Sequence, residues 1–172
     1  RGVSDLEARL KATIRAVPDF PQPGILFRDI TPVLEDAGLC NAAVDGFRRA
    51  LTTQRIDAIA GIESRGFLFG MPLAMALNIP FVTVRKKGKL PLKTVYGSAE
   101  VEMHVDSVKP GMRVMVHDDL LATGGTAAAA AELIRKQGGT VAAFSFLIEL
   151  SFLQGLERLK PYGADVVRLV TY

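Results

Sequence analysis

Apolar residues recur along most of this chain in short continuous runs, and these runs alternate with stretches of helical periodicity. Short apolar runs bounded by turn residues are typical of buried strands. The predicted strands are RIDAIAGI, PFVTVRK, VEMHV, RVMVHD, TVAAFSFLIEL and ADVVRLV, and the predicted helices are GFLFGMPLAMALN, GGTAAAAAELIRKQGG and SFLQGLERLK. Strands that alternate with helices predict an α/β fold with a central, mostly parallel sheet flanked by helices.

The N-terminal segment follows a different pattern. Leu6, Leu10, Ile14 and Val17 recur at near-helical spacing, which predicts a helix that runs to Pro18. The segment PDFPQPGILFRDITP comes next, and its four prolines disfavour any regular element. We therefore expect an extended, fixed loop after the first helix.

Length and composition are those of one globular domain. The chain has 172 residues, 49% hydrophobic and 23% charged, without a repeat or linker, so we expect a single domain over residues 1–172. No apolar run reaches the roughly 18 residues of a membrane span, and no signal peptide is visible. We expect a cytoplasmic protein with no membrane partner. The net charge of +3 does not argue for nucleic acid, since a small anionic ligand fits as well.

A glycine-rich segment between a predicted strand and a predicted helix has the features of a phosphate cradle. Gly124 and Gly125 allow the backbone to turn its N–H groups inward at the start of the helix. Thr123 and Thr126 add hydroxyl donors, and the small side chain of Ala122 leaves space for a phosphate. The segment is neither a Walker A loop nor a dinucleotide fingerprint, because Gly-Lys-Ser/Thr and G-x-G-x-x-G are both missing.

Two adjacent carboxylates, Asp118 and Asp119, precede this cradle. Neighbouring carboxylates repel each other, so a strand end with a purely structural role would avoid them. Carboxylates accept hydrogen bonds from sugar hydroxyls, and they suit Mg²⁺, which prefers oxygen ligands. A phosphate cradle next to two carboxylates therefore predicts a site for a phosphorylated sugar, whereas a strand-end turn before a capped helix is the alternative without a ligand.

Four segments in order resemble one family of enzymes. PDFPQPGILFRDITP, ESRGFLFG, VRKKGKLP and DDLLATGGT are together similar to adenine phosphoribosyltransferases, within the type I phosphoribosyltransferase family, and the resemblance covers nearly the whole chain. It implies the type I phosphoribosyltransferase fold with a small N-terminal hood. It also implies transfer of the phosphoribosyl group from phosphoribosyl pyrophosphate to adenine, which gives AMP and pyrophosphate in purine salvage. Mg²⁺ is the implied cofactor, bound mainly through the substrate rather than directly by the protein, and the implied assembly is a homodimer.

The same resemblance implies the roles of individual residues. The residues implied to hold the 5-phosphate are Ala122, Thr123, Gly124, Gly125 and Thr126. Those implied to face the ribose and to act in catalysis are Asp118 and Asp119, with Arg65 as a further catalytic residue. Those implied to bind pyrophosphate are Arg65, Lys86, Lys87 and Lys89. Those implied to bind adenine are Leu26, Phe27, Arg28 and Leu120.

Two other functions remain open at this point. The first is a phosphoribosyltransferase for another purine base, because base selectivity does not follow from residue spacing. The second is a non-catalytic regulator that senses phosphoribosyl pyrophosphate. A regulator of nucleic acid needs a binding module, and the single short helix before the proline-rich segment has no partner for a helix-turn-helix, so we expect no nucleic-acid partner.

One segment departs from the family pattern. Adenine phosphoribosyltransferases usually have a longer mobile flap between Lys-Leu-Pro and a Leu-Glu-Tyr-Gly motif. Here Val95 stands in the place of the flap glutamate, Tyr96 matches the flap tyrosine, and several residues between Leu90 and Gly97 are missing relative to the family. A truncated flap, which exposes the reaction to water, and a sequence that omits a flap segment are the two explanations.

The remaining candidate ligands predict structural roles. His104 and His117 lack the spacing of metal ligands, and His117 is expected to be a buried histidine with a hydrogen-bond partner. Cys40 is the only cysteine, so no internal disulfide forms, and we expect it to be a small buried residue.

Overall fold

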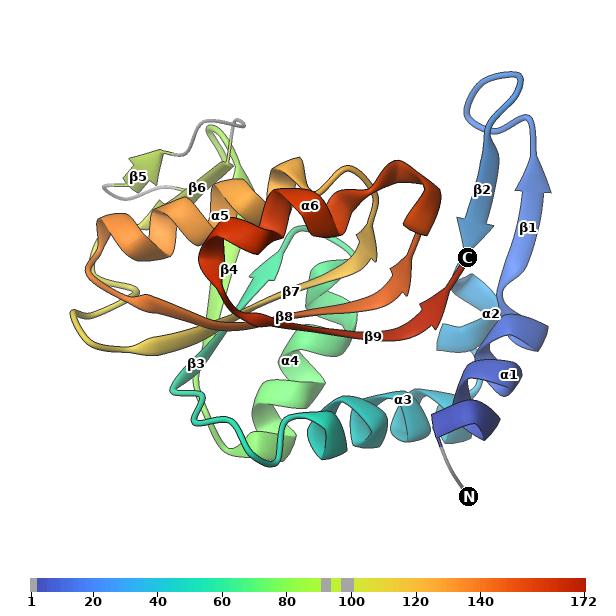
Figure 1. Cartoon of the computed structure of the whole chain (residues 1–172), viewed down its shortest axis with the longest axis horizontal. Coiled ribbons are helices and arrows are strands. Elements are labelled where there is room, and N and C mark those ends of the chain that lie inside the picture. Colours follow the sequence, from blue (N-terminus) through green and yellow to red (C-terminus); the bar gives the residue numbers. More distant parts are fainter. Residues whose placement is uncertain (1–2, 91–93, 97–100) are drawn as a thin grey trace.

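The computed structural model describes residues 3–90, 94–96 and 101–172, and for residues 3–4 and 94–96 it describes the backbone alone. Its centre is a seven-stranded sheet with the order β5-β6-β4-β3-β7-β8-β9 (Figure 1). The strands are β3 Ala58–Ile62, β4 Phe81–Lys86, β5 Thr94–Tyr96, β6 Val101–His104, β7 Arg113–Leu121, β8 Thr140–Glu149 and β9 Asp165–Thr171. β4, β3, β7, β8 and β9 are parallel, and β6 and β5 are added in antiparallel pairing. The predicted mostly parallel sheet is confirmed.

Helices cover both faces of this sheet. They are α1 Val3–Thr13, α2 Thr31–Leu34, α3 Ala37–Ala50, α4 Gly66–Leu77, α5 Gly125–Lys136 and α6 Gly155–Leu159. α5 and α6 lie on one face, and α3 and α4 lie on the other (Figure 1). Each face has its own hydrophobic cluster, with Leu133 of α5 in one and Phe47 and Phe69 of α3 and α4 in the other. Among the described residues, no helix is long and apolar enough to span a membrane.

The N-terminal segment forms a hairpin where the sequence predicts a helix end and a loop. α1 ends at Thr13, and β1 Arg15–Pro18 pairs antiparallel with β2 Leu26–Asp29. The predictions of a helix to Pro18 and of a segment without regular structure are therefore wrong. A proline at the end of an edge strand removes no hydrogen bond from the pairing, so Pro18 is compatible with β1. The hairpin stands beside the carboxyl ends of β7, β8 and β9, as a hood over that edge of the sheet (Figure 1).

Other elements also differ from the prediction. α2, α3 and β5 were not predicted. β7 extends to Leu121, three residues beyond the predicted strand end at Asp118, so Asp119 also lies inside the strand. The predicted helix SFLQGLERLK is divided into a 3-10 turn (Ser151–Leu153), α6 and a second 3-10 turn (Lys160–Tyr162). The division occurs at Gln154, whose φ of 55° is left-handed and ends any right-handed helix.

His117 is buried in the core, as predicted, but of its two ring nitrogens Nε2 has no hydrogen-bond partner among the described residues. Its side chain is fully buried, with Nδ1 2.7 Å from the hydroxyl oxygen of Ser145 and the ring edge-on to Phe47. Burial disfavours the charged imidazolium and lowers the pKa of His117 to about 3. The sheet therefore holds an uncharged imidazole at its centre at neutral pH.

This buried histidine predicts a loss of stability in acid. The folded-state pKa of about 3 lies below the ordinary value of 6.5, so the unfolded chain binds more protons between these two pH values. The contribution to stability is complete above pH 6.5 and is lost as the pH falls toward 3. Between pH 7 and pH 5 we expect it to lower the free energy of unfolding by about 2 kcal/mol.

Urea unfolding at the two pH values measures this effect. The double variant His117→Leu/Ser145→Ala removes both polar partners, and its free energy of unfolding should fall by about 2 kcal/mol less than that of the wild type over the same interval. An identical pH dependence in the two proteins would contradict the prediction.

Candidate functional site

Three cavities lie around the carboxyl ends of the strands, and they differ in chemistry. The phosphate-loop cavity (about 70 Å³) is lined by Asp118 and by residues 120–127. The basic cavity (about 220 Å³) is lined by Glu63, Arg85, Lys86, Lys87 and Thr126, among others. The hood cavity (about 490 Å³) is lined mainly by Phe20, Phe27, Leu34, Arg65 and Leu68. Thr126 lines the first two cavities, so they adjoin each other.

The phosphate loop joins β7 to the start of α5, and its glycines are required by close packing. Gly124 is the residue before the helix and has a left-handed φ of 84°. A Cβ atom on Gly124 would lie 2.7 Å from the carbonyl oxygen of Gly155, so no side chain fits. The loop from Ala122 to Thr126 therefore turns tightly onto the N-terminus of a 12-residue helix, where the backbone N–H groups favour an anion. The structure brings the five predicted phosphate residues together here.

The two aspartates of β7 have different partners. The carboxylate oxygen Oδ2 of Asp119 lies 3.0 Å from Nε of Arg65, and the side chain of Asp119 is buried. Burial, together with the neighbouring charge of Asp119, raises the pKa of Asp118 to about 9. Asp118 therefore favours its protonated form at neutral pH, whereas the carboxylate of Asp119 forms an ion pair with Arg65 beside the phosphate loop.

Arg65 connects the acids to the hood. Its guanidinium lies 5.6 Å from the centre of the Phe27 ring, and it lines the hood cavity. The next residue, Gly66, packs so closely on β7 that a Cβ atom there would lie 3.2 Å from Oδ1 of Asp118. The resemblance assigns Arg65 to pyrophosphate, whereas the structure places it between Asp119 and Phe27.

The hood cavity contains one of the four predicted adenine residues. The Phe27 ring lines this cavity and packs edge-on against Phe20, with ring centres 5.2 Å apart. The guanidinium of Arg28 lies over the ring of the C-terminal Tyr172, at 3.7 Å. Leu26 is exposed, and Leu120 lines the phosphate-loop cavity instead.

Two carboxylates that sequence reasoning missed hold the basic loop (residues 86–90). Glu63 accepts a hydrogen bond from the backbone N–H of Lys86 at 2.6 Å and pairs with Arg85 at 2.9 Å. Glu102 of β6 is buried and accepts from the backbone N–H groups of residues 88 and 90, at 3.0 and 2.8 Å. Burial of Glu102 opposes ionisation, but these hydrogen bonds outweigh it, and its pKa is lowered. A charged residue inside the apolar strand VEMHV is the signal that could have identified it.

The predicted pyrophosphate lysines are presented by this loop. Lys86 and Lys87 line the basic cavity, and Lys89 is exposed on the same turn. The loop backbone is fixed by buried carboxylates, and its lysines carry positive charge at the mouth of the cavity. The side chain of Tyr96, the predicted flap residue, lies outside the described residues, as does the flap segment of residues 91–93.

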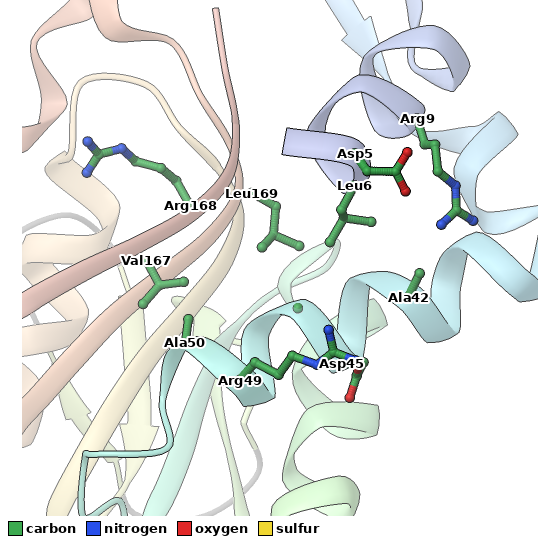
Figure 2. A pocket seen from close by; sticks show the side chains of 11 residues that line it. Asp5, Leu6, Arg9, Ala42, Asp45, Arg49, Ala50, Val167, Arg168 and Leu169 are labelled. Atoms are coloured by element: carbon green, nitrogen blue, oxygen red, sulfur yellow. The ribbon is translucent and has the colours of Figure 1, made fainter. Parts of the chain in front are cut away.

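A fourth cavity lies apart from the predicted site residues. It has a volume of about 550 Å³ and is enclosed by α1, α3 and β9 (Figure 2). Leu6 and Leu169 point toward each other across it, and Arg9, Asp45 and Arg49 stand around it (Figure 2). None of the predicted ligand residues lines this cavity. The candidate site is therefore identified by its chemistry and not by the size of its cavity.

The comparison with protein families agrees with the geometry of the phosphate loop. Residues 40–171 match the model of the phosphoribosyl transferase domain. A protein of Cytophaga hutchinsonii named adenine phosphoribosyltransferase is 51% identical over 174 residues, which cover 97% of this chain and 96% of the relative. This alignment is longer than the 172-residue chain itself, so the relative has residues inside the matched region that this chain lacks. The segment between Leu90 and Gly97, which is shorter than the family pattern, predicts such a difference.

Solved structures give the same result in three dimensions. An adenine phosphoribosyltransferase of Thermoanaerobacter pseudethanolicus superposes with a TM-score of 0.91 at 46% identity, over 96% of this chain and 99% of that one. The enzyme of Saccharomyces cerevisiae, solved with adenine and an imino-altritol bisphosphate, has a TM-score of 0.90 at 39% identity, with coverage of 96% and 99%. The enzyme of Trypanosoma brucei, solved with AMP, pyrophosphate and ribose 5-phosphate, has a TM-score of 0.86 at 25% identity, with coverage of 96% and 79%.

Proposed function

The chain belongs to the phosphoribosyltransferase family, and we propose that it transfers the phosphoribosyl group of phosphoribosyl pyrophosphate to adenine, which gives AMP and pyrophosphate. Relatives of nearly equal length carry the name of this activity, and solved neighbours contain adenine, AMP and pyrophosphate. The reaction returns a free base to the nucleotide pool, so its role is purine salvage.

The observation that carries the proposal is that three chemically different cavities are connected to Asp118 and Asp119 through shared or paired residues. Asp118 lines the phosphate-loop cavity, and Thr126 joins that cavity to the basic one. Arg65 pairs with Asp119 and lines the hood cavity. A ribose at the aspartates would thus have a phosphate site, a pyrophosphate site and an apolar base site within reach, which are the three groups of the two substrates.

The residues fit a displacement at the ribose. N9 of adenine forms a bond to C1 of the ribose while the bond from C1 to the pyrophosphate oxygen breaks, and the electron pair leaves with pyrophosphate. Negative charge grows on the leaving group, so preorganised cations such as Lys86 and Lys87 lower the barrier. Their loop is already held by Glu63 and Glu102, so little reorganisation is needed. The proton lost from N9 is released to solvent.

The paired acids suit the ribose hydroxyls and a metal carried by the substrate. The carboxylate oxygens of Asp119 accept hydrogen bonds, and protonated Asp118 both donates and accepts them. No cluster of three or more His, Cys, Asp or Glu suited to a metal occurs in the described part of the chain. Mg²⁺ prefers oxygen ligands, and the ribose and pyrophosphate oxygens bound beside the two acids would supply most of them. Bound Mg²⁺ would neutralise charge on the pyrophosphate group.

The hood cavity fits the base. Phe20 and Phe27 supply apolar and aromatic surface for a flat ring, and the hairpin that carries them stands over the carboxyl edge (Figure 1). Such a hood shields the reacting carbon from water, which would otherwise hydrolyse the activated sugar. Selectivity among purines depends on polar contacts to the ring edge, so a direct assay must decide it.

Incubation with adenine, phosphoribosyl pyrophosphate and Mg²⁺ should yield AMP and pyrophosphate. Chromatography of the products checks this, with hypoxanthine, guanine and xanthine as parallel substrates. If one of these bases reacts and adenine does not, the proposed base is wrong. If no base reacts but phosphoribosyl pyrophosphate still binds, the protein is a sensor and not a transferase.

The paired acids should be needed for turnover. Asp118→Asn replaces a protonated carboxyl with an amide of the same shape, so the fold should be unchanged while the contact to ribose is altered. Asp119→Asn also removes the ion pair with Arg65. We expect each variant to lower kcat by about 10²–10³-fold, the usual effect of losing a transition-state contact. Steady-state kinetics measure this, with Asp5→Asn at an exposed position of α1 as control. Wild-type kinetics in either variant would remove that acid from the site.

We also propose that the enzyme is a homodimer. Leu68, Met71 and Met75 are exposed on one side of α4, at intervals of three and four residues, and such an apolar stripe is typical of an interface. Arg65 directly precedes this helix, so a partner on α4 would stand close to the site. Sedimentation velocity should show a dimer, and Met71→Glu/Met75→Glu should sediment as a monomer because a charged side chain is costly to bury. A monomeric wild type at assay concentrations would contradict the proposal.

A further inference from the structure

Arg158 of α6 is a cation beside the phosphate loop that has no role in the site as described so far. Its Nη1 atom lies 3.0 Å from the position that a Cβ atom would take on Gly125. Its own Cβ atom lies 3.2 Å from the corresponding position on Gly124. The arginine therefore lies directly against the backbone that forms the phosphate cradle.

The start of α6 is seated on the loop, which fixes this position. A Cβ atom on Gly155 would lie 2.5 Å from the carbonyl oxygen of Ala122, so backbone packs on backbone there. The backbone N–H of Leu150 donates to the carbonyl oxygen of Leu121 at 3.0 Å, just before α6 begins. Arg158 follows Gly155 by three residues and so returns to the same side of the helix, toward the loop.

Arg158 is also a cation at this edge without a carboxylate partner among the described residues. Within the described part of the chain, it makes no ion pair and no hydrogen bond through its side chain. The neighbouring Glu157 is paired with Lys160 at 2.6 Å. The other two arginines of the site are both paired, Arg65 with Asp119 and Arg85 with Glu63.

We propose that Arg158 binds the 5-phosphate of the phosphoribosyl group and of the nucleotide product, a step that rests on the proposed function. The loop offers backbone N–H groups and the hydroxyls of Thr123 and Thr126, but no positive side chain. A guanidinium presents parallel N–H donors that match two phosphate oxygens, and it stays charged at all working pH values. Arg158 therefore adds the missing charge and makes the site favour phosphorylated sugars over unphosphorylated ones.

Binding of AMP and of adenosine separates this role from support of the loop. In titration calorimetry, Arg158→Ala should weaken AMP binding by about tenfold and change adenosine binding by less than about twofold. Arg158→Lys keeps the positive charge but lacks the paired N–H donors of the guanidinium, so it should recover part of the AMP affinity. Lys160→Ala is the matched control, because it removes one positive charge from the same segment, and it should leave both affinities unchanged.

Three results would overturn the proposal. The first is equal AMP affinity in the wild type and in Arg158→Ala, in a preparation that forms AMP from adenine. The second is an equal loss for AMP and adenosine, which would show that the arginine supports the loop and does not bind phosphate. The third is a wild-type protein that shows no turnover to AMP. This result removes the proposed function and this inference with it. The first two leave the proposed function intact, so the failures are distinguishable.

Discussion

The parallel pairing of β3 with β7 is the constraint on which the candidate site depends. Gly61 of β3 stands opposite His117 of β7, so the turn after β3 comes down on the paired aspartates. Gly66 permits this approach because a side chain there would meet the carbonyl oxygen of His117 at 3.0 Å. The same turn delivers Arg65 to Asp119, and a buried carboxylate without such a partner would be strongly destabilising. The register of β3 on β7, the glycine at position 66 and the Arg65–Asp119 ion pair therefore depend on one another.

The other buried acids of the site follow the same rule. Glu63 and Glu102 are enclosed by backbone N–H groups and by Arg85, so their charge is satisfied within the protein. Asp118 has no ion-pair partner among the described residues, and its raised pKa avoids an uncompensated charge by keeping the carboxyl protonated. With the acids satisfied internally, the basic loop keeps its shape before any ligand arrives, and its lysines remain at the surface for an anion. Preorganised charge of this kind is what stabilises a leaving group efficiently.

What the sequence predicted well has a local signal, and what it missed is decided by distant contacts. Six strands of the large sheet and the phosphate loop were predicted because apolar runs, glycines and threonines mark them directly. Arg15–Pro18 was assigned to a helix because Ile14 and Val17 fit the helical period, but pairing with β2 makes this segment a strand. The predicted helix over residues 151–160 is divided where Gly155 packs on Ala122, more than thirty residues away in the sequence. Neither of these long-range contacts can be inferred from the local periodicity of the sequence.

The candidate site shows the same limit at the level of single residues. Resemblance named the phosphate loop, the basic run and the hood, and the structure brings those segments to one edge of the sheet. The resemblance did not reveal that Arg65 lies between Asp119 and Phe27, because that position depends on how the turn after β3 packs against the hood. On the proposed function, an incoming pyrophosphate would compete with Asp119 for this guanidinium. Asp119 would then need new donors, and the hydroxyls of the ribose bound next to it are of the right kind. The acid, the arginine and the two parts of the substrate are therefore linked through a single ion pair.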